Sequence, residues 1–404
     1  MRFLFYSHDG LGLGHTRRHL AVAAALTDLA PDASVLLASG ADDVNHFEQP
    51  RHVEILKLPG LRKVDNDHYV ARRLRIPAAD IRALRSALLQ TAVKSFRPSV
   101  VLVDKHPFGA SGEFRDALKT ARKQGAKTVL GLRDILDAPA TVKKEWARHG
   151  IRDTLEEYYD AVLIYGNRSI FDPVAEYELP PSVARRTRFC GYVVNLESTE
   201  PRADNRWSAL ALPHRARPVV LASTGGGEDG FCLLETFIRA ATGAPWQGIV
   251  IAGPMTPDGE MESLQRQAAA AHVEIHTFVP SLSSLFWSVD ALVCMGGYNT
   301  LAEAVSKGLP TVCVPRISPR SEQLIRARAF ERLGLLRAVR PDQLSAETLR
   351  NEVNAAVARQ RQQLLERANA LLSFDGARQA ATHLLALAAT QEKVVAVPVE
   401  GVAG

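Results

Sequence analysis

The sequence predicts an α/β fold made of two doubly wound parallel sheets, and three observations predict it. The chain has 404 residues, too many for a single core of about 100–200 residues. Short uninterrupted apolar runs alternate with helical segments in both halves, which is typical of parallel strands buried on both faces. The alternation stops at a polar, proline-containing stretch, residues 197–218, and then begins again. We therefore expect two domains joined by a linker.

The first domain is expected over residues 1–196. Its first strand is followed by a glycine-rich turn and an amphipathic helix, residues 15–29, and a second strong helix is expected over 78–94. The run Val-Val-Leu-Val that ends at Asp104 shows the pattern of a strand buried on both faces. By the same criterion the strands are expected over 3–7, 34–38, 53–58, 100–103, 127–132 and 161–165.

The linker is expected over 197–215 and the second domain over 216–370. Its strands are expected over 219–223, 248–252, 273–278, 291–295 and 311–315, and its late helices over 346–358 and 376–389. Residues 371–392 are expected to form a C-terminal helix that packs back across the linker. Residues 393–404 have no helical period, so a frayed tail is expected there.

Composition and charge narrow the class of protein. With 46% hydrophobic and 23% charged residues, the chain is neither disordered nor fibrous. A net charge of +5 admits an anionic ligand or an anionic membrane surface, but it is too small and too dispersed to favour nucleic acid. The apolar start ends at His8 and Asp9, too early for a signal peptide, and no run is long enough to span a membrane. We therefore expect a cytoplasmic protein.

The four cysteines indicate a reducing compartment. Each lies alone beside an apolar run, and no pair has the spacing of a metal site. All four are expected to be buried, reduced thiols.

A ligand is expected where the loops that follow the strands of both sheets face each other, because open parallel sheets bind ligands beyond the carboxyl ends of their strands. The first such loop is Gly-Leu-Gly-Leu-Gly-His-Thr-Arg-Arg, residues 10–18. Its glycines let the backbone approach a ligand, and the next helix begins with free N–H groups. It is not a dinucleotide fingerprint, because His15 stands where the third glycine belongs. A plain turn remains the alternative, but His15 is unlike a core histidine.

Three loops of the second half have the same layout. Residues 223–230, Ser-Thr-Gly-Gly-Gly-Glu-Asp-Gly, suit a phosphate held on backbone amides but lack the lysine of a P-loop. Residues 294–303 run from a strand through two glycines into a helix, where Glu303 can accept protons from two ribose hydroxyls or can complement the helix dipole. Residues 315–323 bring polar and cationic groups to the same edge.

The segments Gly-Gly-Tyr-Asn-Thr-Leu-Ala-Glu (296–303), Gly-Leu-Pro (308–310) and the later Glu-Gln (322–323) together resemble the donor-binding signature of GT-B glycosyltransferases, most of all family 28. The N-terminal loop resembles the glycine-rich loop of that family, and equally the Gly-His loop of nucleotide-sugar hydrolases of pseudaminic acid synthesis. The resemblance implies two Rossmann-like domains facing across a cleft. It covers both halves, although residues 40–210 carry no diagnostic motif.

Carried over by position, the resemblance implies that Glu303 holds the ribose and that 223–227 and 296–300 hold the diphosphate. Many relatives have a histidine where Met295 stands, so we expect arginine and backbone amides to contact the diphosphate instead. The residues expected to bind the donor are Gly14, Ser223, Thr224, Gly225, Gly226, Phe278, Val279, Gly296, Gly297, Asn299, Thr300, Glu303, Arg316, Arg320, Glu322 and Gln323. Of these, Phe278 and Val279 would read the base, and Glu322 and Gln323 would contact the sugar.

The implied reaction is metal-independent and cofactor-free transfer of a hexosyl group from a nucleotide-diphosphate sugar, taken as UDP-linked, to an unidentified acceptor. Inversion at the anomeric carbon is expected by analogy alone. The attacking hydroxyl needs a base, and His15 is the first candidate, followed by Asp104 and His106. A hydrolase that uses water as acceptor and a non-catalytic nucleotide-sugar-binding protein remain alternatives. A lipid-linked acceptor would bring the protein to the inner face of the membrane.

Three other patterns do not favour a site. Asp65-Asn66-Asp67 matches a manganese-binding DxD but lies in a charged loop rather than after a buried strand. His272, Glu274 and His276 share one face of a strand without a further ligand, so an edge strand is expected. Residues 109–113 miss the last glycine of a nucleophile elbow, which argues against a serine hydrolase.

Overall fold

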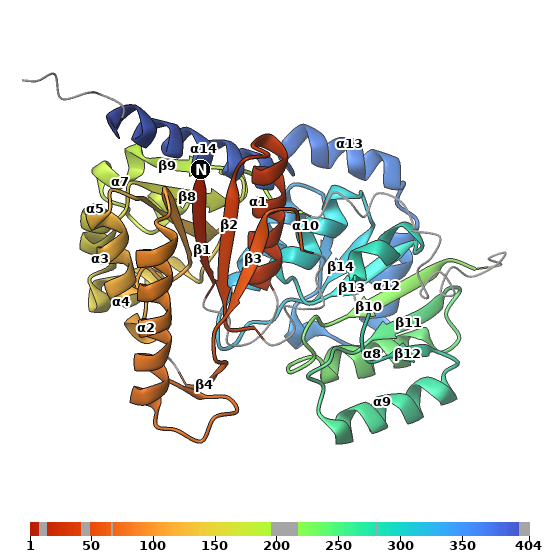
Figure 1. Ribbon diagram of the computed structural model, residues 1–404. Coiled ribbons are helices and arrows are strands. Elements are labelled where there is room, and N and C mark those ends of the chain that lie inside the picture. Colours follow the sequence, from red (N-terminus) through yellow and green to blue (C-terminus); the bar gives the residue numbers. More distant parts are fainter. Residues whose placement is uncertain (8–13, 42–48, 66–67, 195–216, 280, 396–404) are drawn as a thin grey trace, which may run out of the picture.

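The computed structural model describes residues 1–7, 14–41, 49–65, 68–194, 217–279 and 281–395. It contains two parallel sheets, each with helices on both faces, and they lie side by side in Figure 1. The predicted fold class is confirmed. Residues 8–13, which include the first four residues of the glycine-rich loop at 10–18, and the expected linker at 197–215 lie outside the described residues.

The N-terminal sheet has seven parallel strands in the order β3-β2-β1-β6-β7-β8-β9. Its core strands are rich in Val, Leu and Phe, which suit a sheet buried on both faces. The strands are β1 Arg2–Ser7, β2 Ser34–Ser39, β3 Val53–Lys57, β6 Val100–Asp104, β7 Lys127–Arg133, β8 Ala161–Tyr165 and β9 Thr187–Phe189. The helices are α1 Gly14–Leu29, α2 Ala78–Phe96, α3 Arg115–Lys123, α4 Pro139–His149, α5 Ile151–Tyr158, α6 Pro173–Glu176 and α7 Pro181–Arg185.

The C-terminal sheet has six parallel strands in the order β12-β11-β10-β13-β14-β15. The strands are β10 Val219–Ser223, β11 Gln247–Ile251, β12 Glu274–His276, β13 Ala291–Cys294, β14 Thr311–Cys313 and β15 Arg337–Ala338. The helices are α8 Phe231–Ala241, α9 Asp258–Ala270, α10 Tyr298–Ser306, α11 Glu322–Arg332, α12 Ala346–Val357, α13 Arg361–Leu371 and α14 Gly376–Val395. Helix α14 returns to the N-terminal domain and lies against α1 (Figure 1).

Several expectations about elements are wrong in detail. An antiparallel hairpin, β4 Leu61–Asp65 and β5 His68–Ala71, was not expected. Of the stretch expected to be a charged loop, Asp65 ends β4, and residues 66–67 lie outside the described residues. A small antiparallel sheet needs only one apolar face, so a search for continuous apolar runs misses it. The same search misses the short strands β9 and β15. Helix α14 continues to Val395, beyond the expected start of the tail at 393, and residues 396–404 lie outside the described residues.

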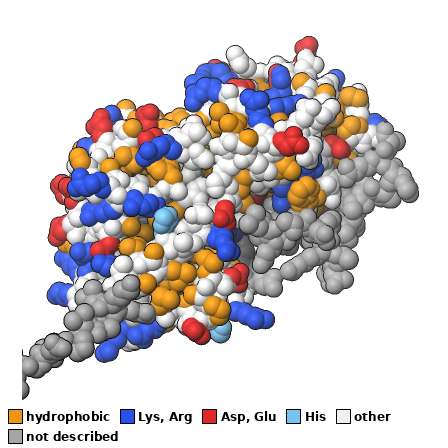
Figure 2. Space-filling view, turned by 90° about the horizontal axis from the view of Figure 1, so that it is seen from above, with side chains coloured by type: hydrophobic (Ala, Val, Ile, Leu, Met, Phe, Trp, Pro, Cys, Tyr) orange, Lys and Arg blue, Asp and Glu red, His pale blue; other side chains and the backbone are white. Residues whose placement is uncertain are grey.

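The surface and the cysteines bear on the class of protein. Of the four thiols, three are buried as expected, but Cys232 is exposed because it lies on the outer side of the first turn of α8. Basic side chains are scattered among acidic and hydrophobic ones on the face shown in Figure 2. Within the part of the chain described, no helix has the length and apolar character needed to cross a bilayer.

Candidate functional site

In both sheets, predicted loops lie at the point where an open α/β sheet usually binds its ligand. The strand order reverses between β1 and β6 in the first sheet and between β10 and β13 in the second. Loops that leave adjacent strands in opposite directions at such a switch point make room for a ligand. The predicted loops follow β1, β10, β13 and β14, so three of the four adjoin a switch point.

The first switch point carries a cluster built around Asp104, the last residue of β6. His15, the second residue of α1, places Nδ1 2.8 Å from Asp104 Oδ2. Arg18, one helical turn later, donates from Nη2 to the same oxygen at 2.6 Å, and this nitrogen is also 2.9 Å from His15 Nδ1. His15 and Asp104 are 89 positions apart in sequence. The fold therefore joins two of the three predicted catalytic residues.

Charge around Asp104 favours its ionised form. The carboxylate is fully buried, and burial raises its pKa, but Arg18 and His15 more than offset this, so the pKa lies well below its usual range. His19 lies 3.9 Å from the same oxygen and is also fully buried. Burial lowers the pKa of His19 to about 4, so this imidazole is neutral at pH 7.

The third predicted catalytic residue lies on the next loop. The backbone amide of His106 donates to the carbonyl of Asp104 at 2.8 Å. This turn carries Lys105 in the left-handed region, with φ of 66°. His106 is half-buried and stays a predicted catalytic candidate.

The loop after β10 is held by backbone contacts. Ser223 is buried and its Oγ accepts from the amide of Gly225, while the Thr224 hydroxyl donates to the carbonyl of Ala252. A Cβ on Gly226 would lie 2.5 Å from the end of the Met255 side chain, and one on Gly225 would meet nothing within 4 Å. The loop is thus compact on one side and open at Gly225, as backbone recognition of a phosphate requires.

The loop after β13 leads into α10 beside the N-terminal domain. Gly296 has φ of 86° and Gly297 caps the helix, so Asn299 and Thr300 lie in its first turn. The first turn of a helix has N–H groups without intrahelical partners and a positive dipole end. A Cβ on Gly14 would lie 3.2 Å from Nδ2 of Asn299. Close approach at glycine therefore brings the predicted donor loop next to the start of α1.

Glu303, in the second turn of α10, also connects the domains. Its Oε1 lies 3.2 Å from Nη2 of Arg17, the residue before Arg18 on α1. The carboxylate is almost fully buried, and burial raises its pKa, while Arg17 and Lys307 oppose that rise. The predicted ribose ligand thus lies at the domain interface and already faces a cation.

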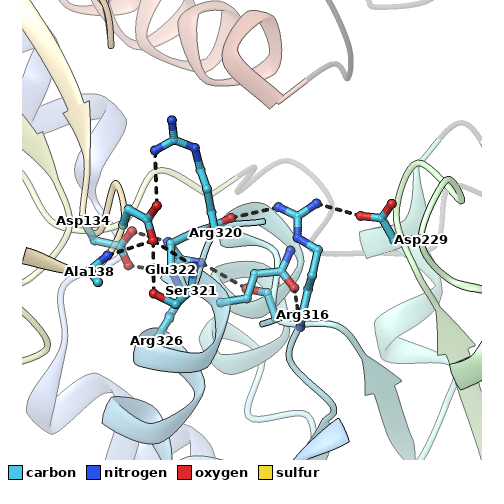
Figure 3. A network of polar contacts seen from close by, with 11 residues as sticks. Asp134, Ala138, Asp229, Arg316, Arg320, Ser321, Glu322 and Arg326 are labelled. Carbon is cyan, nitrogen blue, oxygen red and sulfur yellow. Dashed lines mark hydrogen bonds and ion pairs between the residues drawn. The ribbon is translucent and has the colours of Figure 1, made fainter. Parts of the chain in front are cut away.

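The predicted arginines at the end of the second sheet are engaged by carboxylates (Figure 3). Arg316 donates to Asp229 at 2.7 Å and to Glu322 at 3.1 Å. Its backbone amide donates to Gln323 Oε1 at 3.1 Å. The structure therefore brings three of the expected donor contacts into one network, but Arg316 shares its charge with two carboxylates.

Arg320 turns toward the N-terminal domain instead. Its guanidinium lies 3.4 Å from Asp137 Oδ2 and 3.1 Å from Glu145 Oε1. Asp137 also accepts from the amide and the hydroxyl of Ser321. In this structure Arg320 therefore acts as an interdomain contact.

The strongest interdomain contact was not predicted from the sequence. Arg326 on α11 donates to Asp134 through Nε at 2.8 Å and through Nη2 at 2.7 Å, and Nη1 donates to the carbonyl of Gly296 at 3.0 Å. Both side chains are buried. Tyr298 lies between this pair and Arg18, with its ring 5.7 Å and 5.5 Å from the two guanidinium carbons. The sequence signal that could have indicated this contact is the pair of charged residues, Arg133 and Asp134, at the end of a buried strand.

The remaining predicted residues lie at the end of β12. Phe278 is 39% exposed while Val279 is buried, so one ring is presented at the carboxyl edge of the sheet. Among the described residues no group of three or more His, Cys, Asp or Glu side chains could hold a metal ion. His276 pairs with Glu274 at 2.6 Å on β12, which is an edge strand as expected.

Comparisons with known proteins show which proteins this chain resembles. Residues 239–384 match the model of the glycosyltransferase family 28 C-terminal domain. The NDP-glycosyltransferase YjiC of Bacillus licheniformis is 30% identical over 139 residues, which is 34% of this chain and 33% of that protein. UDP-N-acetylglucosamine–N-acetylmuramyl-(pentapeptide) pyrophosphoryl-undecaprenol N-acetylglucosamine transferase of Limosilactobacillus fermentum is 27% identical, covering 87% of this chain and 88% of that one.

Solved structures show the same fold over nearly the whole chain. UDP-glucose: anthocyanidin 3-O-glucosyltransferase has a TM-score of 0.66 at 12% identity and covers 97% of this chain and 99% of its own. MurG of Acinetobacter baumannii has a TM-score of 0.56 at 15% identity, with 96% and 99% covered. The chain therefore has the GT-B fold, and with its family 28 C-terminal match it is a glycosyltransferase similar to that family.

Proposed function

We propose that this glycosyltransferase moves a hexosyl group from a nucleotide-diphosphate sugar to a hydroxyl of a second substrate, with inversion at the anomeric carbon. The donor is proposed to be UDP-linked, because the Limosilactobacillus fermentum relative and the anthocyanidin glucosyltransferase are named for UDP-sugars. The observation that carries the proposal is the His15–Asp104 pair, 2.8 Å apart at the first switch point. This pair adjoins the donor loop through the close approach of Gly14 to Asn299. A base and a phosphate-binding helix end thus lie on either side of one interface.

The donor is proposed to bind the C-terminal domain. The amides of residues 223–227 and the first turn of α10 would hold the diphosphate, and Glu303 would accept hydrogen bonds from the ribose hydroxyls. Phe278, exposed at the end of β12, would pack against the base. Preorganised donors of this kind stabilise the negative charge that develops on the leaving diphosphate.

His15 is proposed as the general base. Asp104 only accepts hydrogen bonds, so a proton on His15 Nδ1 donates to it and leaves Nε2 able to accept the proton of the attacking hydroxyl. The hydroxyl oxygen bonds to the anomeric carbon, the sugar–diphosphate bond breaks, and the diphosphate leaves with the electron pair. Arg18 competes with His15 for the same oxygen of Asp104 and keeps that carboxylate ionised.

Peripheral membrane contact of a cytoplasmic enzyme is the second part of the proposal. Leu74, Ile76 and Leu84 are exposed on β5–α2, where Arg73, Arg75 and Arg82 are exposed as well. Apolar and basic side chains together suit an anionic lipid surface, and the fermentum relative is named for an undecaprenol-linked substrate. Cosedimentation should be stronger with vesicles containing phosphatidylglycerol than with phosphatidylcholine alone. Equal sedimentation with both would contradict this part.

The test of the reaction is release of nucleoside diphosphate from a panel of UDP-, GDP- and dTDP-sugars. Turnover that needs an added hydroxyl acceptor and is lost in His15→Ala supports transfer. Rapid release in water alone, also lost in His15→Ala, would instead identify a hydrolase. Donor binding without any turnover across acceptor classes would indicate a binding protein, and absence of binding would overturn the donor site.

A further inference from the structure

Arg133 lies at the domain interface without a carboxylate partner. It is the last residue of β7 and is in register with Tyr165 of β8, while Gly131 of β7 is in register with Asp104 of β6. Side chains alternate along a strand, so Arg133 points to the same face as Asp104 and Tyr165. That face carries Arg18, whose guanidinium lies 5.0 Å from the ring of Tyr165.

The neighbouring arginines are all neutralised, but Arg133 is not. Among the described residues no hydrogen bond or ion pair within 4.0 Å reaches its guanidinium, and its Nε is buried without a partner. By contrast, each nearby arginine holds a carboxylate: Arg18 with Asp104, Arg326 with Asp134, Arg316 with Asp229 and Glu322, and Arg320 with Asp137 and Glu145.

The electrostatic surroundings of Arg133 show the same imbalance. Burial lowers its pKa, and the positive charges of Arg326 and Arg18 lower it further, while Glu322 and Asp134 oppose them without reversing the direction. A guanidinium nevertheless stays protonated in proteins. A cation with unused donors in such a place gains most from an anionic ligand that accepts its hydrogen bonds.

We propose that Arg133 binds a phosphate group of a substrate at the domain interface, and that this phosphate is the sugar-bearing one of the donor. The inference rests on the proposed function. Arg326, beside Arg133, donates to the carbonyl of Gly296 in the donor loop, and Glu322 begins α11 at the same edge. As the sugar–oxygen bond breaks, its electron pair moves to that phosphate, and Arg133 donates hydrogen bonds to the charge formed.

The role expected from the sequence for Arg316 and Arg320 thus passes to a residue of the opposite domain. Those two arginines are shared with Asp229, Asp137 and Glu145. A diphosphate would have to compete with these carboxylates for them. Arg133 has no such competitor within hydrogen-bond distance among the described residues, so a phosphate would not have to displace a carboxylate from it.

The experiment is calorimetric titration of uridine, UMP and UDP into wild type, Arg133→Met and Arg133→Lys, with the guanosine and thymidine series used if those bind instead. A charge-assisted hydrogen bond contributes about 1.5–3 kcal/mol, so Arg133→Met should weaken UDP by about 10–100-fold. Uridine should bind equally, and Arg133→Lys should recover part of the affinity. Arg328→Met, an exposed arginine of α11, is the matched control and should change nothing.

Thermal unfolding of the ligand-free protein separates binding from structure. Arg133 is half-buried, and its buried Nε has no partner. Desolvating a cation without a partner is costly, so Arg133→Met should raise Tm even as it weakens UDP. A lower Tm together with unchanged UDP affinity would mean that Arg133 is structural, and would overturn the proposal.

Phenyl phosphate titrated into UDP-saturated protein tests whether Arg133 binds a phosphate of the acceptor instead of the donor. If only this binding is lost in Arg133→Met, the phosphate belongs to the acceptor and the donor assignment is overturned. Equal binding in all titrations overturns the site itself. If wild type binds no nucleoside diphosphate at all, it is the proposed function that fails.

Discussion

The two domains carry their parts of the site in different ways. On the C-terminal side, the proposed donor loops are contiguous segments, residues 223–230 and 296–303, whose glycines and helix ends would act through the backbone. On the N-terminal side, the cluster joins side chains that are distant in sequence, with Asp104 accepting from Arg18 at 2.6 Å and lying 2.8 Å from His15. Backbone recognition leaves a readable motif, whereas a side-chain cluster becomes visible only after folding.

The largest expected effect tests the chemical role of the N-terminal cluster. A positioned general base contributes about 10²–10⁴-fold, so His15→Ala should lower kcat by that factor. Donor affinity, which the opposite domain is proposed to supply, should stay within about twofold. Steady-state kinetics with calorimetry on the same variant makes the measurement. His106→Ala is the comparison variant, because His106 is the other predicted histidine and its backbone amide contacts Asp104. A larger loss from His106 than from His15 would reverse the assignment.

The next largest effect tests the buried ion pair Arg326–Asp134, which joins the two domains. Removing one partner of a buried ion pair costs about 3–5 kcal/mol because the other charge is left unpaired. Arg326→Met should therefore destabilise the protein by about that amount, since Arg326 and Asp134 are at most 1% exposed. The double variant Arg326→Met with Asp134→Leu should recover much of the loss.

The control for that measurement is the exposed pair Arg340–Asp342. Water and salt screen exposed pairs, which contribute little to stability, so Arg340→Met should hardly shift the urea midpoint. Equal effects from the buried and the exposed substitutions would show that the Arg326–Asp134 contact does not hold the domains together.

The comparison also explains what the sequence could predict. Continuous apolar runs such as the one ending at Asp104 predict the parallel sheets, because burial on both faces leaves little room for polar residues. Loops after strands predict where the ligand edge lies. Which side chains pair across that edge depends on how the two domains dock, and no local pattern encodes it. Thus Arg320 was expected at the diphosphate but contacts Asp137, and Arg326–Asp134 was not anticipated.

His19 gives the N-terminal cluster a pH dependence that the donor loops lack. Its pKa is about 4 in the folded protein, because of burial, against about 6.5 when unfolded. Between these values the unfolded chain binds more protons, so stability falls as the pH is lowered from about 6.5 to 4. The full change is on the order of 3 kcal/mol.

Denaturant unfolding from pH 7.5 to 4.5 checks this expectation. His19→Leu should flatten the curve, because it removes the titrating group, whose two ring nitrogens are both buried without hydrogen bonds. His149→Gln, at the exposed end of α4, is the control and should keep the wild-type slope. An unchanged slope in His19→Leu would place the acid sensitivity elsewhere.

The smallest effects lie where the two regions meet, at Arg17 and Glu303. Loss of a hydrogen bond to a charged group costs about 1.5–3 kcal/mol, so Glu303→Gln should weaken nucleotide binding by about 10–100-fold. The kcat at saturating donor should change little, because His15 is unaltered. Titration of UDP into the variant measures the change.

Arg17→Met should act in the opposite direction. Ribose hydroxyls must compete with the Arg17 guanidinium, 3.2 Å from Oε1 of Glu303, and the pair is partly exposed, so the competition is weak. Removing Arg17 should therefore tighten UDP by at most a few-fold, and the gain should vanish when Glu303→Gln is also present. If Arg17→Met instead weakens UDP in both backgrounds, Arg17 itself binds the nucleotide, and the donor site extends from the contiguous loops onto the side chains of α1.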